Sequence, residues 1–310
     1  MEEKYEHIKC NLCGKDDTKK LTEKGQFNLP ANVVICRNCG LTYLNPRWTK
    51  PTYFDFYTNH YDKYYRPNIK NVSAEHNVTE PIFKRLTKMA LLDKKPRNIL
   101  DIGSGSGLTL DFFKLKYPKS NFYAIEPSDT AVAMLEKKGI ETISRDVDDN
   151  WHKSVQKKFD LIIMRHVLEH FSNPVAALKK IESTLTDDGI LYIAVPNCSN
   201  PIAPLLTHWF RVVHTYYFNK TTLHGILNKS QLQLLKAVEG DDFNRGEMYA
   251  FAKKQVKDSD TLIIDRSNFE TQLDVYESRL KNERQLLPTF KRKSNLLISE
   301  LKGLLNKKNA

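Results

Sequence analysis

The stretch Asn98-Ile-Leu-Asp-Ile-Gly-Ser-Gly-Ser-Gly107 joins an apolar run to a glycine-rich turn. Ile99 and Ile102 belong to a pattern that predicts a buried strand, and a helical pattern begins directly after the turn. A turn between a strand and a helix brings backbone N–H groups and the helix N-terminus close to a ligand. Glycines let the backbone approach that ligand without a Cβ in the way. The stretch therefore predicts a ligand site at the end of a central strand.

The glycine spacing excludes two common nucleotide motifs. A dinucleotide fingerprint needs its third glycine one position later, where Leu108 stands. The phosphate-binding loop of nucleotide hydrolases needs Gly-Lys-Ser/Thr, which is absent. What remains is Asp101 followed after one residue by G-x-G-x-G.

Strand and helix patterns alternate after this turn. Alternation of this length predicts a parallel, doubly wound sheet with helices on both faces. A final antiparallel hairpin is expected at 233–252. The predicted strands are Phe122–Glu126, Ile140–Ile143, Phe159–Met164, Ile190–Pro196, Gln233–Val238 and Met248–Ala252.

Acidic residues follow two of these strands. Glu126 ends the second strand, where a carboxylate can accept both ribose hydroxyls of an adenosine. Asp146 follows the third strand and is placed to meet an adenine amino group. Ligands of such sheets bind at the carboxyl ends of the strands, where these acids collect.

With Ile125-Glu-Pro-Ser128, Phe159–His170, Asn173-Pro174 and Gly189–Asn197, the stretch resembles a class I S-adenosylmethionine (SAM) methyltransferase over residues 96–255. The resemblance implies a Rossmann-like α/β fold with a seven-stranded sheet, mostly parallel with an antiparallel last strand. It also implies SAM as the cofactor. The implied cofactor-binding residues are Asp101, Gly103, Ser104, Gly105, Gly107, Glu126, Pro127, Asp146, Arg165, Tyr61 and Tyr65.

The chain is similar to the branch with an N-terminal zinc ribbon and an Asn-Pro-Arg connector, whose members often methylate sugars, nucleotide-linked sugars or other small metabolites. Sugar C-methyltransferases of this branch usually carry a further α/β domain. Here only about 55 residues follow the sheet, which disfavours C-methylation of that kind.

Residues 1–48 are predicted to form a zinc ribbon with two C-x2-C-G knuckles. They are Cys10-Asn-Leu-Cys13-Gly and Cys36-Arg-Asn-Cys39-Gly, with 22 residues between them. Paired thiolates at this spacing are typical of a tetrahedral zinc site, and four protein ligands leave no open position, so the metal is predicted to be structural. Short strands are expected at Gln26–Leu29 and Asn32–Ile35.

Residues 49–95 form an aromatic and helical connector. Its tyrosines, which include Tyr61 and Tyr65, either hold the ribbon on the main domain or line a partly wet pocket. A helix is expected over 71–92 because apolar residues recur there at helical spacing.

His166-Val-Leu-Glu169-His170 spells H-x-x-E-H, the motif of inverted zinc proteases. That chemistry needs both histidines on one helix, whereas here they follow a buried strand immediately, which disfavours a protease. In the methyltransferase interpretation the segment forms the floor of the pocket. His166 or His170 is then a candidate general base for an acceptor hydroxyl. Alternatively, Glu169 and His170 only organise the loop by hydrogen bonds.

Residues 197–218 are expected to cover the acceptor side of the pocket as a lid. They contain His214, a second candidate base whose alternative role is simple packing.

From residue 256 to 310 the pattern becomes helical, with Leu296, Leu301 and Leu305 flanked by basic residues. Such a segment can rest on an anionic membrane, pair with another subunit or pack back on the parent domain.

Composition limits the remaining function classes. The first residues are charged and no apolar run approaches about 20 residues, so neither a signal peptide nor a membrane span is expected and the cytoplasm is the predicted location. The net charge of +11 suits acidic partners, including nucleotide-linked acceptors. An RNA methyltransferase that docks through its ribbon, or a non-catalytic scaffold with the SAM fold, are the alternatives to a small-molecule or glycan methyltransferase.

Overall fold

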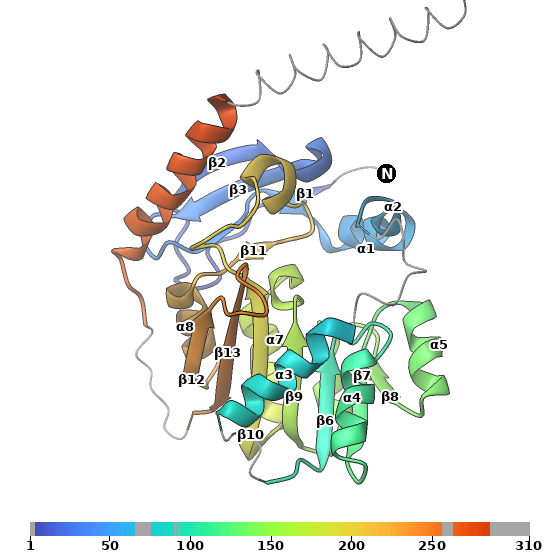
Figure 1. Cartoon of the computed structure of the whole chain (residues 1–310). Helices are drawn as coiled ribbons and strands as arrows, with labels where there is room; N and C mark the ends of the chain where they lie inside the picture. Colours follow the sequence, from blue (N-terminus) through green and yellow to red (C-terminus); the bar gives the residue numbers. More distant parts are fainter. Residues whose placement is uncertain (1–3, 66–75, 90, 92–93, 256–262, 286–310) are drawn as a thin grey trace, which may run out of the picture.

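A seven-stranded sheet forms the centre of the computed structural model, which describes residues 4–65, 76–89, 91, 94–255 and 263–285 (Figure 1). The strand order is β12-β13-β10-β9-β6-β7-β8. All neighbouring pairs are parallel except those of β13, which runs antiparallel to both β10 and β12. The predicted mostly parallel sheet with one antiparallel strand is therefore confirmed. The bounds are β6 Asn98–Ile102, β7 Asn121–Ile125, β8 Glu141–Ser144, β9 Phe159–Arg165, β10 Leu185–Pro196, β12 Leu232–Glu239 and β13 Glu247–Lys254.

Helices cover both faces of this sheet because successive strand residues point to opposite sides and both sides are apolar. One core contains Leu86, Phe113 and Leu135, from α3, α4 and α5. The other contains Trp151, Leu178 and Ile226, from α6, α7 and α8. The helices are α3 His76–Lys88, α4 Leu108–Lys116, α5 Asp129–Lys137, α6 Trp151–Ser154, α7 Pro174–Thr184 and α8 Lys220–Lys229.

The N-terminal region forms a small antiparallel sheet of β2 Thr18–Lys24, β3 Pro30–Cys36 and β4 Thr42–Leu44. β1 Tyr5–Glu6 pairs separately with β5 Arg47–Trp48. The predicted strand at Gln26–Leu29 is wrong, because Gln26–Asn28 is a 3₁₀ turn in which Phe27 and Asn28 have positive φ. The strand lies earlier, in β2, whose single buried residue Leu21 gives little apolar signal.

The lid, residues 197–218, is built into this same sheet. Its β11, Tyr216–Tyr217, pairs antiparallel with β4, so the sheet order is β11-β4-β3-β2. Between β10 and β11 the lid contains the π-helical turn η4 at Leu205–Trp209. The ribbon and the lid are therefore one structural layer at one end of the central sheet (Figure 1).

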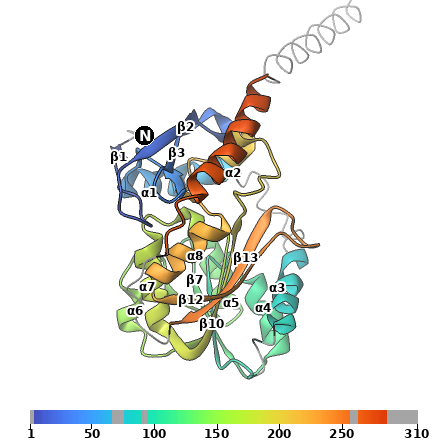
Figure 2. The same ribbon diagram turned by 90° about the vertical axis from the view of Figure 1, so that its left-hand side faces the viewer.

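The helix at 268–285 lies along the ribbon layer (Figure 2). Its side chains Phe269, Leu273 and Tyr276 share a core with ribbon and lid residues, among them Val33 and Phe210. Packing back on the chain, one of the roles expected for the C-terminal extension, holds for this helix. The predicted helical segment with Leu296, Leu301, Leu305 and its basic flanks lies outside the described residues.

The connector contains α1 Lys50–Asn59 and α2 Tyr61–Tyr65, which lie beside the ribbon (Figure 1). Within the described ranges, no helix is both long and apolar enough to cross a membrane.

Candidate active site and metal centre

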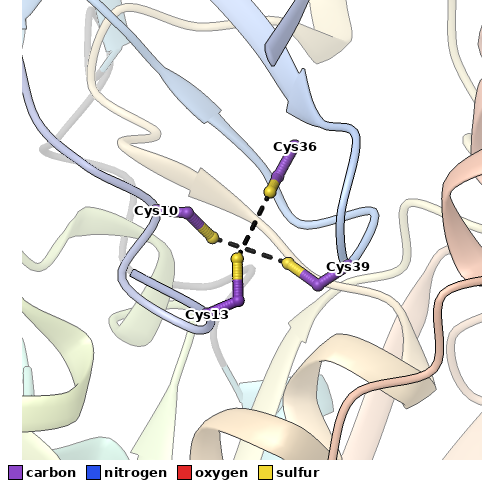
Figure 3. A group of neighbouring side chains, drawn as sticks. All are labelled: Cys10, Cys13, Cys36 and Cys39. Atoms are coloured by element: carbon purple, nitrogen blue, oxygen red, sulfur yellow. Dashed lines mark hydrogen bonds between the residues drawn. The ribbon is translucent and has the colours of Figure 1, made fainter. Parts of the chain in front are cut away.

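The four knuckle cysteines converge on one point (Figure 3). The Sγ atoms of Cys10 and Cys39 lie 3.5 Å apart, as do those of Cys13 and Cys36. Four thiolates at the zinc–sulfur bond length have Sγ atoms about 3.8 Å apart around a tetrahedral ion. The cluster therefore fits zinc, and Gly14 and Gly40, which follow the knuckles, have the positive φ that such turns require.

The knuckles also contact the catalytic domain. The Asn11 side chain bonds the N-terminus of α7 through Asn173 and the N–H of Val175, at 2.9 and 3.1 Å. Lys229 of α8 donates to the carbonyl oxygens of Asn11 and Leu12. The metal centre thus lies where the ribbon packs on α7 and α8. Loss of the metal would therefore disturb these contacts as well as the ribbon.

The glycine loop after β6 has the geometry expected for close approach of a ligand. Gly103, Gly105 and Gly107 have φ of 73°, 54° and 81°. A Cβ on Gly105 would meet nothing within 4 Å, whereas a Cβ on Gly103 would lie 2.4 Å from Cγ2 of Val167. Gly105 therefore faces open space, and Gly103 packs the loop against the segment that follows β9.

Two buried acids stand beside this loop. Glu126 accepts the N–H of Gly105 at 2.8 Å and the N–H of Ser128 at 3.0 Å, which fixes its carboxylate at the end of β7. Burial, together with the nearby charge of Glu126, raises the pKa of Asp101 to about 8. A buried carboxyl in this state is stabilised in its charged form by a cationic ligand. Ser104 adds a buried hydroxyl with no partner among the described residues. These groups fit the cationic, hydroxyl-bearing SAM.

The remaining predicted cofactor residues lie directly after β7, after β8 and in α2. Asp146 pairs with Lys50 of α1 at 2.8 Å and accepts the N–H of Asp148. Pro127 is exposed after Glu126. Tyr61 and Tyr65 pack on each other, with ring centroids 5.2 Å apart, beside the core of Trp48, Phe56 and Val213. Their cofactor contacts stay a prediction, and their packing supports the role of holding the connector in place.

Arg165 and His166 meet an acid that the sequence analysis did not single out. Glu247, at the start of β13, lies 2.9 Å from Nε2 of His166 and accepts a hydrogen bond of 3.1 Å from Nε of Arg165. Arg85 of α3 donates to its other oxygen at 2.6 Å. Burial alone would raise the pKa of Glu247, but His166 and Arg165 lower it to about 2.

The same pairing fixes the charge of His166. Burial alone would lower its pKa, but Glu169 and Glu247 raise it to about 9. His166 is therefore protonated at neutral pH, which disfavours it as a general base. The backbone here has φ of 52°, so the residue turns the chain out of β9 as expected.

Glu169, His170 and His214 form a second cluster. Their ligand atoms all lie within 4.8 Å of one another, and Glu169 is 1% exposed. Burial lowers the pKa of His170, and burial and the neighbouring His170 lower that of His214 well below its usual value. Both rings are neutral at neutral pH.

The ribbon layer holds this cluster in position. Thr215 Oγ1 lies 2.9 Å from the carbonyl oxygen of Glu169 and 2.7 Å from that of Phe171. Arg47 donates to the carbonyl oxygen of Ser172 at 2.7 Å, and Tyr57 Oη lies 3.1 Å from Nδ1 of His170. No sequence pattern indicated the positioning roles of Thr215 and Glu247. An acid at the start of an otherwise apolar strand was the only signal for the latter.

More than half of the chain matches a known protein family. Residues 74–237 match the family described as "Methyltransferase domain". The chain belongs to the methyltransferase-domain family. The predicted class, a SAM-dependent methyltransferase with a Rossmann-like sheet, is confirmed at the level of the family, whereas the sugar-specific branch stays a prediction.

Two curated relatives match parts of this domain. The malonyl-[acyl-carrier protein] O-methyltransferase of Acetivibrio thermocellus is 27% identical over 132 residues, which cover 40% of this chain and 44% of that protein. The ribosomal RNA small subunit methyltransferase G of Malacoplasma penetrans is 38% identical over 85 residues, covering 26% and 36%. The chain spans less than half the length of either relative.

Solved structures of methyltransferases are also similar to this chain. The plantazolicin methyltransferase BamL, in complex with an analogue and SAH, has 17% identity and a TM-score of 0.49, covering 74% of this chain and 85% of that one. A SAM-dependent methyltransferase from Clostridium acetobutylicum ATCC 824 has 13% identity and a TM-score of 0.45, covering 65% and 99%.

Proposed function

We propose that this protein transfers a methyl group from SAM to a hydroxyl of a small acceptor, namely a sugar, a nucleotide-linked sugar or a glycan intermediate. The observation that carries the proposal is the pair of neutral imidazoles of the buried His214 and the half-buried His170, next to the segment that packs on the glycine loop. A neutral imidazole accepts a proton from a hydroxyl, whereas transfer to a carboxylate or an activated carbon needs no such base.

The cofactor half of the site has a simple division of roles. Glu126, held at the end of β7, is assigned to the ribose hydroxyls, and Asp101 is assigned to the cationic end of SAM because its raised pKa favours a cationic neighbour. Bound SAM would supply an electrophilic methyl group on a sulfonium. Gly103 and Gly105 let the backbone lie against it, which holds the donor at a fixed distance from the acceptor.

On the acceptor half, His170 has the orientation that a base requires. Its Nδ1 lies 2.8 Å from the carbonyl oxygen of Val213, and a ring nitrogen that faces a carbonyl must carry the proton. Nε2 therefore carries the lone pair and can accept the hydroxyl proton. His166 stays protonated against Glu247 and shapes the loop instead.

The surroundings support a sugar-like acceptor. Tyr57, 38% exposed, reaches His170 with its hydroxyl, and its ring lies tilted at 39° against that of Tyr61, with centroids 5.0 Å apart. Aromatic faces with polar tips suit sugar rings, whose C–H faces are apolar and whose edges are polar. The net charge of +11 suits a phosphate on the same acceptor.

An RNA acceptor is the second candidate. The 38% identity to a ribosomal RNA methyltransferase and the basic charge favour it, although that identity covers only 26% of this chain. A retained SAM fold without turnover is the remaining alternative.

The test measures cofactor binding and transfer separately. Calorimetry with SAH is expected to show one site per chain, and labelled methyl transfer is then assayed against sugar nucleotides, simple sugars and total RNA. The variant His170→Gln is expected to keep SAH binding and lose about 10²–10⁴-fold in kcat. Label in RNA alone would favour the second candidate. SAH binding without transfer to any acceptor would favour a scaffold, and absence of SAH binding contradicts the proposal altogether.

A further inference from the structure

The carboxylate of Glu169 is buried without adequate partners. Both oxygens lack a hydrogen bond among the described residues, although the side chain is 2% exposed. Its nearest basic atoms are Nδ1 of His166 at 3.4 Å and Nε2 of His170 at 4.0 Å. A buried carboxylate is expected to be hydrogen-bonded, paired or bound to a metal ion. The first two explanations are incomplete here. The ion pairs with His166 and His170 both engage Oε1, and Oε2 has neither a hydrogen bond nor an ion pair among the described residues.

Two imidazoles face this carboxylate. The Nδ1 of His170 is held by the carbonyl oxygen of Val213, which leaves the lone pair of Nε2 toward Glu169. Histidines that bind metals are oriented in the same way, because the nitrogen that does not coordinate donates to a carbonyl or a carboxylate. The ring of His214 stands at 87° to that of His170, with centroids 4.9 Å apart, and is 6% exposed.

We propose that Glu169, His170 and His214 bind one divalent transition-metal ion, such as Zn²⁺, separate from the four-cysteine site. One ligand atom of each lies within 4.8 Å of the other two. Bonds of zinc to nitrogen and oxygen place neighbouring ligand atoms about 3–4 Å apart, so small side-chain movements would complete the site. Two imidazoles and one carboxylate suit zinc or iron, whereas Mg²⁺ and Ca²⁺ prefer oxygen ligands.

The cluster supplies three ligands and keeps access to solvent, since the side chain of His170 is 22% exposed. Three protein ligands with one open position are the arrangement of catalytic zinc sites. An ion there would lower the pKa of a hydroxyl bound to it. In that case His170 would coordinate the ion instead of accepting the proton, and the acceptor would be activated by coordination. Metal binding itself does not depend on the identity of the acceptor.

Cobalt titration of the full chain tests the proposal. The protein is stripped of metal under reducing conditions and titrated with Co²⁺, which gives a thiolate charge-transfer band only in the four-cysteine site. Two equivalents are expected per chain, one with this band and one without it. Glu169→Gln and His214→Gln are each expected to bind one equivalent and to keep the band.

His208→Gln is the matched control, because His208 is an exposed histidine in the same lid. This variant is expected to keep two equivalents. The thiolate band and SAH binding report whether the other variants are folded and whether the cofactor site is intact. A single equivalent in the unaltered protein, or a second equivalent that survives both Glu169→Gln and His214→Gln, would overturn the proposal whether or not methyl transfer is found.

Discussion

His166 and Glu247 form an ion pair, with Nε2 and Oε2 2.9 Å apart. One residue follows the end of β9 and the other begins β13, so the pair ties the segment after the central strands to the closing hairpin. His166 has the left-handed φ of 52°, and this contact helps to hold a backbone conformation that most residues avoid. The pair has a measurable consequence for stability.

Stability should fall as pH rises above neutrality. The pKa of His166 is raised from 6.5 to about 9, so its contribution is complete below pH 6.5 and is lost as pH approaches 9. The pKa of Glu247 is lowered from 4.5 to about 2, so its contribution is complete above pH 4.5 and is lost toward pH 2. The pair is therefore strongest between pH 4.5 and 6.5. Urea unfolding at pH 6 and 9 measures the loss.

The variant Glu247→Gln should reduce this dependence, because the histidine then loses one of its two acidic partners. The control is Glu239→Gln, which alters an exposed acid at the end of β12. Equal pH dependence in Glu247→Gln and the unaltered protein would refute the assignment.

Removal of zinc should impair transfer more than cofactor binding. The variant Cys39→Ser is expected to lower the melting temperature and to reduce methyl transfer at least about tenfold, because the ribbon layer positions Glu169 and His170 through Arg47 and Thr215. SAH binding should change less than about threefold, since Glu126 lies on the central sheet.

Cys198→Ser is the control for that experiment. Cys198 is buried and lies outside the four-cysteine cluster. Its variant should therefore still bind one metal ion with the thiolate charge-transfer band of that cluster. If Cys39→Ser weakens SAH binding as much as transfer, the division between the two halves of the site is wrong.

Glu126→Gln should weaken SAH binding roughly 10–100-fold, because hydrogen bonds to a charged group contribute about 1.5–3 kcal/mol. Calorimetry measures the change directly. Glu136→Gln, which alters an exposed glutamate of α5, should leave the dissociation constant unaltered.

SAM binding should release a proton near pH 7.5. The pKa of Asp101 is raised to about 8, so much of this carboxyl is protonated before binding, and a cationic ligand lowers that pKa. Calorimetry in buffers of different ionisation enthalpy gives the number of protons released. Asp101→Asn should abolish the release, and an unchanged value in that variant would assign the proton to another group.

Gly103→Ala should impair both cofactor binding and stability. The residue has φ of 73°, and its new Cβ would lie 2.4 Å from Val167. The left-handed backbone alone costs an alanine about 1–2 kcal/mol. The double variant Gly103→Ala/Val167→Ala should recover the part of the lost stability that arises from the clash between the new Cβ and Val167. A double-mutant cycle by urea unfolding measures this coupling, and strictly additive effects would show that the two side chains do not interfere.

The order of residues along the chain was enough to predict the central sheet and to locate the candidate metal and cofactor motifs. Alternating apolar segments specify a parallel sheet because both faces of each strand must be buried. The G-x-G-x-G turn and the cysteine knuckles are local, so spacing alone fixes which atoms converge. Glu126 could be predicted for the same reason, since the end of a known strand places it at the known edge of the sheet.

The way in which distant segments complete the site became visible only in the folded chain. Glu247 meets His166 because the last strand runs antiparallel beside β10 and brings its first residue to the same edge. The lid joins the ribbon sheet through β11, and Val213 thereby fixes the tautomer of His170. These contacts depend on the packing of segments far apart in the chain, which no local pattern records, so the charge states of the three histidines became defined only in the folded molecule.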